Sequence, residues 1–405
     1  MMDTLTHVIF ALPLLVTLNH FGLASLFALY ARATSLRKNY ALEPTVSVLL
    51  PCFNEGEHVI KTIESIIHSN YPLHKIELIA VDDCSADDTF AWLQKAAQQW
   101  PMMVVLRNEK NIGKHHTVFR ARAHSTGEIL ICIDSDSIFD KQAIRELTSC
   151  FVDENIGAVG GRVAISNARK NIFTHGQTLM YHYIFRIAKM PQNWARNVTC
   201  ISGCIFAVRR RHLDAIAQRV QARNWFGIGI KEGEDSYMTH LLLLEGLKTY
   251  MNIDAICWTA APDHFKQLFM QQLRWRRSAM RDFFWTIRTF QQNVKVQNPF
   301  ILTGYLLVSV LFLLEPAMYM QAAASGLLGD YFLAMVPLFF GIHVMMGIVA
   351  NMYMRKRDPT QCVNPLLTGF LGVWYAVDSF FLTVIAIATF DVGEWGTRGT
   401  SRKKD

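Results

Sequence analysis

The protein has 405 residues, of which 51% are hydrophobic and 12% aromatic, and a net charge of +7. This composition excludes disordered, collagen-like and disulfide-rich chains. The apolar residues are concentrated in residues 5–30 and 299–390, whereas residues 31–298 read like a soluble α/β protein. The sequence therefore predicts an integral membrane protein with a large polar domain.

The positive charge does not indicate a nucleic-acid partner. Basic residues gather beside the apolar segments, in residues 32–38, 355–357 and 402–404. Such flanks fix the orientation of membrane segments, so we expect a lipid bilayer and no nucleic acid as partner. The eight cysteines lack paired metal-type spacing, and we expect free thiols in a reducing compartment.

The first apolar run, Leu5 to Tyr30, is long enough to cross a hydrocarbon core, which takes roughly 20 residues. No small-residue cleavage pattern precedes Arg32, so we predict a retained anchor rather than a cleaved leader. The basic residues that follow predict that the chain from residue 31 onward lies in the cytoplasm.

Four aliphatic runs alternate with helix-length segments, at residues 46–50, 76–81, 103–106 and 129–133. This alternation predicts a mainly parallel sheet with helices on both faces. Polar residues follow three of the runs: Asn54-Glu55, Asp82-Asp83 and Asp134-Ser135-Asp136. Ligands bind at the carboxyl ends of parallel strands, so these acidic groups are expected to face one crevice.

The remaining hydrophobic segments are helical. Residues 172–189 and 265–290 have apolar helical spacing, which indicates interfacial helices or helices packed on the domain. Residues 298–328 and 331–354 predict two spans. The last stretch, 363–390, has basic flanks on both sides, so either the C-terminus lies outside or the stretch, which carries Gly372 and Asp378, enters the membrane and returns.

Two acidic motifs suggest chemistry. Asp134 and Asp136 can hold a hard divalent cation that bridges a diphosphate, although acidic turns are common. Lys114, after Gly113, offers a cation for a phosphate. Glu234 and Asp235 begin a helix-like run, where carboxylates either act on a substrate or cap the helix.

A third motif, Gln271 to Trp275, combines amides, a guanidinium and a flat ring. Such a set can hold a diphosphate and stack on a sugar. The same residue types also form belts at membrane interfaces.

Together the motifs resemble the processive membrane branch of the family-two glycosyltransferases, and most of all hyaluronan synthases, chitin synthases and nodulation-type chitooligosaccharide synthases. The resemblance covers residues 46 to about 290. It is carried by Pro51-Cys52-Phe53-Asn54-Glu55, Val81-Asp82-Asp83-Cys84-Ser85, Asn111-Ile112-Gly113-Lys114, Asp134-Ser135-Asp136, Ile201-Ser202-Gly203-Cys204, Gly233-Glu234-Asp235, Gln271 to Trp275 and, at the C-terminus, Trp395-Gly396-Thr397-Arg398.

The resemblance implies a GT-A fold that uses a UDP-sugar donor, a growing glycan acceptor and Mg²⁺ or Mn²⁺. It implies that uridine is bound by Pro51, Asn54, Glu55, Asp82 and Asp83. Lys114 would face the nucleotide sugar, Asp136 and Asp134 would hold the metal, and Asp235, beside Glu234, would be the general base. The leaving diphosphate and the acceptor would contact Gln271, Arg274, Trp275 and, from the tail, Arg398. Cys84 and Cys204 depart from the family pattern, where many relatives have glycine and hyaluronan synthases usually have proline.

The prediction is therefore a processive, inverting β-glycosyltransferase of the inner or plasma membrane, multi-pass, with a cytoplasmic catalytic domain. It would polymerise and export an N-acetylglucosamine-containing glycan from UDP-GlcNAc, of the chitin or chitooligosaccharide type. The alternatives are a hyaluronan synthase that also uses UDP-glucuronate, and a transporter with a regulatory nucleotide-binding domain. The expected parts are an anchor (1–31), the GT-A domain (44–262), interfacial helices (263–297), a transmembrane region (298–390) and a basic tail (391–405).

Overall fold

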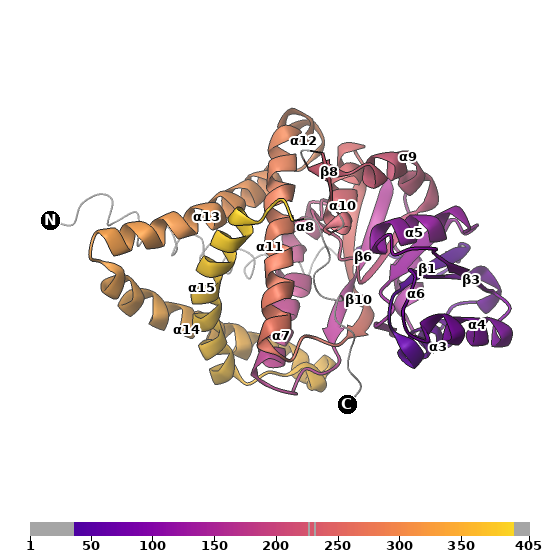
Figure 1. Ribbon diagram of the computed structural model, residues 1–405, viewed down its shortest axis with the longest axis horizontal. Coiled ribbons are helices and arrows are strands. Elements are labelled where there is room, and N and C mark those ends of the chain that lie inside the picture. The colour runs from indigo at the N-terminus through magenta and orange to yellow at the C-terminus, as the bar shows by residue number, and fades with distance from the viewer. Residues whose placement is uncertain (1–35, 226, 231, 393–405) are drawn as a thin grey trace.

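The computed structural model describes residues 36–392, except 226 and 231. The predicted N-terminal anchor and the tail with Trp395 and Arg398 lie outside the described residues. The described chain forms a sheet domain and a helical region that lie side by side (Figure 1). The predicted architecture, an α/β domain followed by apolar helices, is confirmed.

An eight-stranded sheet forms the centre of the domain, in the order β3-β2-β1-β4-β7-β6-β10-β5. Its parallel strands β1 to β4 are the four predicted aliphatic runs, while β7 runs antiparallel between β4 and β6. A two-stranded sheet, β8-β9, is separate. The strands are β1 (Val46–Cys52), β2 (Ile76–Asp82), β3 (Met103–Arg107), β4 (Ile129–Ile133), β5 (Ile138–Phe139), β6 (Ile156–Ile165), β7 (Ile205–Arg209), β8 (Asn224–Trp225), β9 (Ile228–Gly229) and β10 (Lys248–Thr259).

Helices cover both faces of the sheet, as the alternating pattern predicted (Figure 1). One face carries α5 (Lys114–Ala123), α9 (Arg210–Gln221) and α10 (Glu234–Leu244). The other carries α3 (Val59–Ile67), α4 (Thr89–Gln99) and α6 (Ala143–Thr148). Short 3₁₀ turns lie at Gly56–His58, Leu73–Lys75 and Pro359–Gln361.

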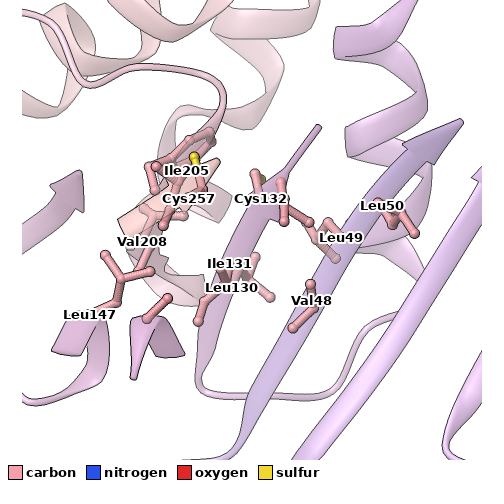
Figure 2. Packing of buried hydrophobic residues seen from close by; sticks show 14 of the residues in the cluster. Val48, Leu49, Leu50, Leu130, Ile131, Cys132, Leu147, Ile205, Val208 and Cys257 are labelled. Atoms are coloured by element: carbon pink, nitrogen blue, oxygen red, sulfur yellow. The ribbon is translucent and has the colours of Figure 1, made fainter. Parts of the chain in front are cut away.

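The core of the domain lies along the central strands. Figure 2 shows Leu49 on β1, Leu130 on β4 and Val208 on β7; the strand register places them on the same face of the sheet, and all three are fully buried. Burial of each such side chain contributes about 1.5–3 kcal/mol relative to exposure. The packed strands therefore form a rigid base for the loops at their ends.

Two amphipathic regions join the sheet domain to the apolar helices. The first comprises α7 (Ile172–His182), the π-helix η5 (Tyr183–Ala188) and α8 (Lys189–Trp194). The second comprises α11 (Phe265–Arg288) and α12 (Phe290–Val296). Helix α7 contacts β6 on one side and α14 and α15 on the other, so it packs on the domain itself.

Three helices among the described residues are long and apolar enough to cross a membrane: α13 (Pro299–Ala324), α14 (Leu328–Arg357) and α15 (Pro365–Ala388). Helices α13 and α14 extend away from the sheet domain and meet at the turn between them (Figure 1). Helix α15 runs along α11 and α14.

Helix α15 is one unbroken helix, so a segment that turns back within residues 363–390 is not found. The sequence suggested a break because it contains Gly372. In the structure Gly372 lies against His343 of α14, where a Cβ would overlap the imidazole ring. Thr368 donates a hydrogen bond to the His343 carbonyl, 3.0 Å away. The small residue therefore allows close helix packing rather than a turn.

Both ends of α15 nevertheless contact the domain side of the molecule. Before the helix begins, the Gln361 side chain exchanges hydrogen bonds of 3.1 and 2.8 Å with the backbone of Ile165 on β6. After it ends, the Phe390 carbonyl accepts hydrogen bonds from Arg281 of α11. Its 24 residues, about 36 Å of helix, thus lie along the flank of the domain.

Candidate active site

A crevice lies at the carboxyl ends of the parallel strands. Asp134 follows β4 directly, and Gly203 comes just before β7. Because β7 is antiparallel and Ile205 pairs with Ile133, the start of β7 lies at the edge where β4 ends. Lys114 begins α5 over the same edge. The topology therefore brings together three motifs that are far apart in the sequence.

Lys114 is the central cation of the crevice. Its ammonium pairs with the Asp134 carboxylate, lies 3.9 Å from Oε1 of Glu234, and donates to the Gly203 carbonyl at 3.3 Å. Burial by itself would lower the pKa of Lys114, but the carboxylates of Asp134 and Glu234 outweigh it and raise the pKa above its ordinary value. The group stays positively charged and suited to bind an anion.

Asp235 stands on the other side of Gly203. Its Oδ2 accepts a 2.8 Å hydrogen bond from the Gly203 amide. A Cβ at Gly203 would lie 3.3 Å from both Asp235 Oδ2 and Lys114 Nζ, so a side chain there would push against both groups. Glycine thus lets a carboxylate and an ammonium approach the same backbone segment.

The turn before α10 directs Asp235 into the crevice. Gly233 has φ +71°, in the left-handed region that favours glycine, and a Cβ there would overlap Ser278 of α11. Burial raises the pKa of Glu234, an effect that the nearby Lys114 partly offsets. Glu234 and Asp235 therefore begin one helix but have different surroundings.

Asp83 organises the loop that leads to Lys114. Its Oδ1 accepts hydrogen bonds from the Ile112 amide at 2.9 Å and from Asn108 Nδ2 at 2.6 Å, and its Oδ2 accepts one from the Gly113 amide at 2.9 Å. These bonds fix the direction in which α5 begins. They occupy both oxygens of a carboxylate that the sequence predicted to bind uridine.

The other predicted nucleotide residues lie at the same edge. Asp82 is fully buried, with Oδ2 3.2 Å from Arg107 Nε, and Glu55 accepts a 2.9 Å hydrogen bond from Ser135 Oγ. Asn54, at φ +55°, accepts from the Ala86 amide at 2.9 Å. Pro51 lines the same cavity as Lys114, Glu234 and Asp235.

The predicted metal ligands differ in exposure. Asp136 is exposed, whereas Asp134 is partly buried and paired with Lys114. In the described part of the chain, no three His, Cys, Asp or Glu side chains form a metal-binding group. The eight cysteines form no disulfide bond among the described residues.

Gln271, Arg274 and Trp275 lie on α11, which packs beside the crevice. The Trp275 ring is 6.0 Å from the Tyr181 ring, measured between centroids. Burial raises the pKa of both Tyr181 and Glu232, and the positive charge of Arg274 offsets part of this effect. The guanidinium therefore lies near the loop before α10, while Arg398 is outside the described residues.

Sequence reasoning missed a charged cluster behind the crevice, formed by the buried Arg223, Glu232 and Arg281 and the partly buried Asp282. Burial raises the pKa of Asp282 to about 6. A signal was present, because Arg274, Arg277 and Arg281 are spaced three and four residues apart and share one helix face. Their proximity to apolar segments favoured the interpretation as a membrane belt.

Comparison with known proteins agrees with this geometry. The family described as Glycosyltransferase like family 2 matches residues 44–278, and the chain belongs to that family. It is an enzyme of the glycosyltransferase class.

Two relatives and one solved structure are similar to this protein over most of its length. A hyaluronan synthase from Streptococcus pyogenes is 23% identical over 87% of this chain and 83% of its own. An N-acetylglucosaminyltransferase from Bradyrhizobium diazoefficiens is 29% identical over 71% of this chain and 59% of its own. The fold is similar to that of the mannosyltransferase PcManGT from Pyrobaculum calidifontis, solved in complex with GDP-Man and Mn²⁺. The TM-score is 0.63 and the sequence identity 18%, over 93% of this chain and 99% of that one.

Proposed function

We propose that the protein is a processive, inverting β-glycosyltransferase that polymerises an N-acetylglucosamine-containing glycan from UDP-GlcNAc. The observation that carries this proposal is the arrangement of Lys114 and Asp235 on either side of Gly203. A fixed cation and a fixed carboxylate within one crevice suit a reaction that binds a diphosphate and removes a proton. Similarity to hyaluronan synthase and to N-acetylglucosaminyltransferases supports the sugar class.

In this proposal Asp235 accepts the proton of the acceptor hydroxyl as that oxygen attacks the anomeric carbon. Attack from the face opposite the leaving UDP inverts an α-linked donor to a β-linkage. Lys114 and Arg274 neutralise the negative charge that grows on the diphosphate, which stabilises the transition state electrostatically. Trp275 offers an aromatic face on which an acceptor sugar can stack.

The chemistry of Asp134 and Asp136 suits a divalent cation. Mg²⁺ is usually held by one or two carboxylates together with substrate phosphates rather than by an all-protein cage, so a pair of aspartates is a sufficient protein contribution. A bound Mg²⁺ or Mn²⁺ would supply further charge neutralisation of the diphosphate. Asp136→Ala is expected to weaken metal-dependent UDP binding, and full activity of that variant in EDTA would contradict the assignment.

We further propose that the catalytic domain and the tail both lie in the cytoplasm. The contacts of Gln361 with Ile165 and of Phe390 with Arg281 support this, because both ends of α15 meet the domain. Helices α13 and α14 would then cross and return. A cysteine at Ser401, with native thiols removed, is expected to resist an impermeant maleimide in intact cells and to react after lysis. Labelling in intact cells would contradict it.

The decisive experiment is incorporation of radiolabelled sugar by the purified full-length protein. UDP-GlcNAc alone is expected to give labelled polymer. A requirement for UDP-glucuronate as well would favour the second candidate, a hyaluronan synthase, which the long match to the streptococcal enzyme supports. Failure of both donors to label any product would reject the proposed function.

A further inference from the structure

Arg281 joins three segments that are distant in the sequence. It lies on α11 and is only 1% exposed. Its Nη1 donates to Glu232 Oε1 at 2.8 Å, while Nε and Nη2 donate to the Phe390 carbonyl at 3.0 and 2.8 Å. Nη2 also donates to the Val392 carbonyl at 2.8 Å. One planar guanidinium therefore connects the loop before α10 with the chain that follows α15.

The Glu232 side of this connection leads directly to Asp235, three residues later. Glu232 is 1% exposed, and its own carbonyl accepts a 2.8 Å hydrogen bond from Arg223 Nη1. Gly233 follows with no room for a side chain because Ser278 of α11 lies against it. The backbone just before Asp235 is therefore held by Arg223 and by the α11 residues Ser278 and Arg281.

We infer that Arg281 is a positioning residue, which sets the place of Asp235 through its hydrogen bond to Glu232. The inference rests on the proposed function, in which Asp235 is the base. A displacement of the base by about 1 Å is enough to lower the rate roughly 10²-fold.

The contact between Arg277 and Thr389 provides a matched control for a purely structural role. It lies one helical turn before Arg281 and donates from Nε and Nη2 to Thr389 Oγ1, at 3.0 and 2.7 Å. This contact anchors the same end of α15 without a hydrogen bond to Glu232. Thr389→Val therefore loosens the end of α15 and leaves the Arg281 to Glu232 bond in place.

The test compares Arg281→Lys, Glu232→Gln, their double variant and Thr389→Val in the full-length protein. Lysine keeps the charge but loses the forked geometry, and glutamine keeps an acceptor oxygen but loses the charge. We expect kcat to fall about 10- to 100-fold in both single variants, with UDP affinity within about threefold of wild type. The double variant is expected to be no slower than the slower single variant, because both changes break one connection. Thr389→Val is expected to change kcat less than about threefold.

Equal loss of kcat in Thr389→Val and Arg281→Lys would overturn the inference, and so would a parallel loss of UDP affinity or multiplicative effects in the double variant. Thermal unfolding is measured for every protein. If Arg281→Lys does not fold, the kcat and UDP affinity of Glu232→Gln test the inference. Wild-type turnover is measured in the same preparation. If the wild type transfers sugar and Glu232→Gln matches its rate, only this inference fails. If the wild type transfers none, the proposed function fails.

Discussion

The catalytic crevice and the helical flank hold their charged groups in different ways. In the crevice, carboxylates are fixed by nearby backbone amides, as Asp83 is by Gly113 and Asp235 by Gly203. On the flank, α11 arginines bond to partners more than 100 residues away, as Arg276 does with Ser379. Reactive groups are thus fixed by backbone amides 30 and 32 positions away in the sequence, whereas the flank depends on packing between helices about 100 positions apart.

The largest effect is expected at the crevice. Asp235→Asn should reduce sugar transfer about 10²- to 10⁴-fold, because the amide cannot accept the acceptor proton. UDP affinity should stay within about threefold, since Asp235 touches the acceptor rather than the nucleotide. Initial rates and UDP titration measure the two quantities. Asp214→Asn, a surface change opposite Arg122, is the control. A loss of UDP affinity as large as the loss of rate would count against the role as base.

Substitutions on the helical flank should first lower the stability of the protein. Arg276 donates to Thr383 Oγ1 at 3.0 Å and to Ser379 Oγ at 2.8 Å, and Ser379 donates to Glu315 Oε2 at 2.7 Å. Arg276→Met should destabilise the protein by about 2 kcal/mol, because it removes the cation from a partly buried network of hydrogen bonds. Adding Glu315→Gln should recover at least half of this loss. Thermal unfolding of the four proteins in one detergent tests the coupling, and simple additivity would refute it.

Asp282 lies between the two regions. Its ionisation should make the free energy of unfolding about 2 kcal/mol lower at pH 7.5 than at pH 4.5. Burial raises its folded pKa from 3.8 to about 6, so its favourable contribution is complete below the unfolded pKa and is lost as pH rises through about 6. Asp282→Asn should therefore flatten the pH dependence of stability between pH 4 and 7. Unfolding midpoints at pH 4.5 and 7.5 measure this, and an unchanged difference between them would exclude Asp282 as the cause.

The smallest effect is expected at Cys84, whose φ of +61° lies in the left-handed region. Cys84→Gly relieves about 1 kcal/mol of strain but costs a similar amount of chain entropy, so stability should change by less than about 0.5 kcal/mol. Cys84→Ala keeps the strain and serves as the control. If glycine lowered the unfolding midpoint by several degrees relative to alanine, backbone strain would not be the relevant factor.

The division between the regions also explains what could be predicted from sequence. Strands β1 to β4 were found because buried parallel strands are continuously aliphatic. The antiparallel insertion of β7, which brings Gly203 beside Asp134, has no comparable local signal. The chemistry-bearing residues were found because their motifs are short. The bond between Glu232 and Arg281 was not, because it joins residues 49 positions apart that each resemble ordinary surface charges.

The placement of α15 has a practical consequence for handling the enzyme. A fragment that ends after α12 would keep the whole sheet and the crevice, but Arg276 would lose Ser379, and Arg281 would lose the Phe390 and Val392 carbonyls. It would also uncover the faces of α7 and α11 that α15 now covers. Such a fragment should aggregate on expression without detergent, so screening of inhibitors will require the full-length protein extracted with its lipid-facing helices.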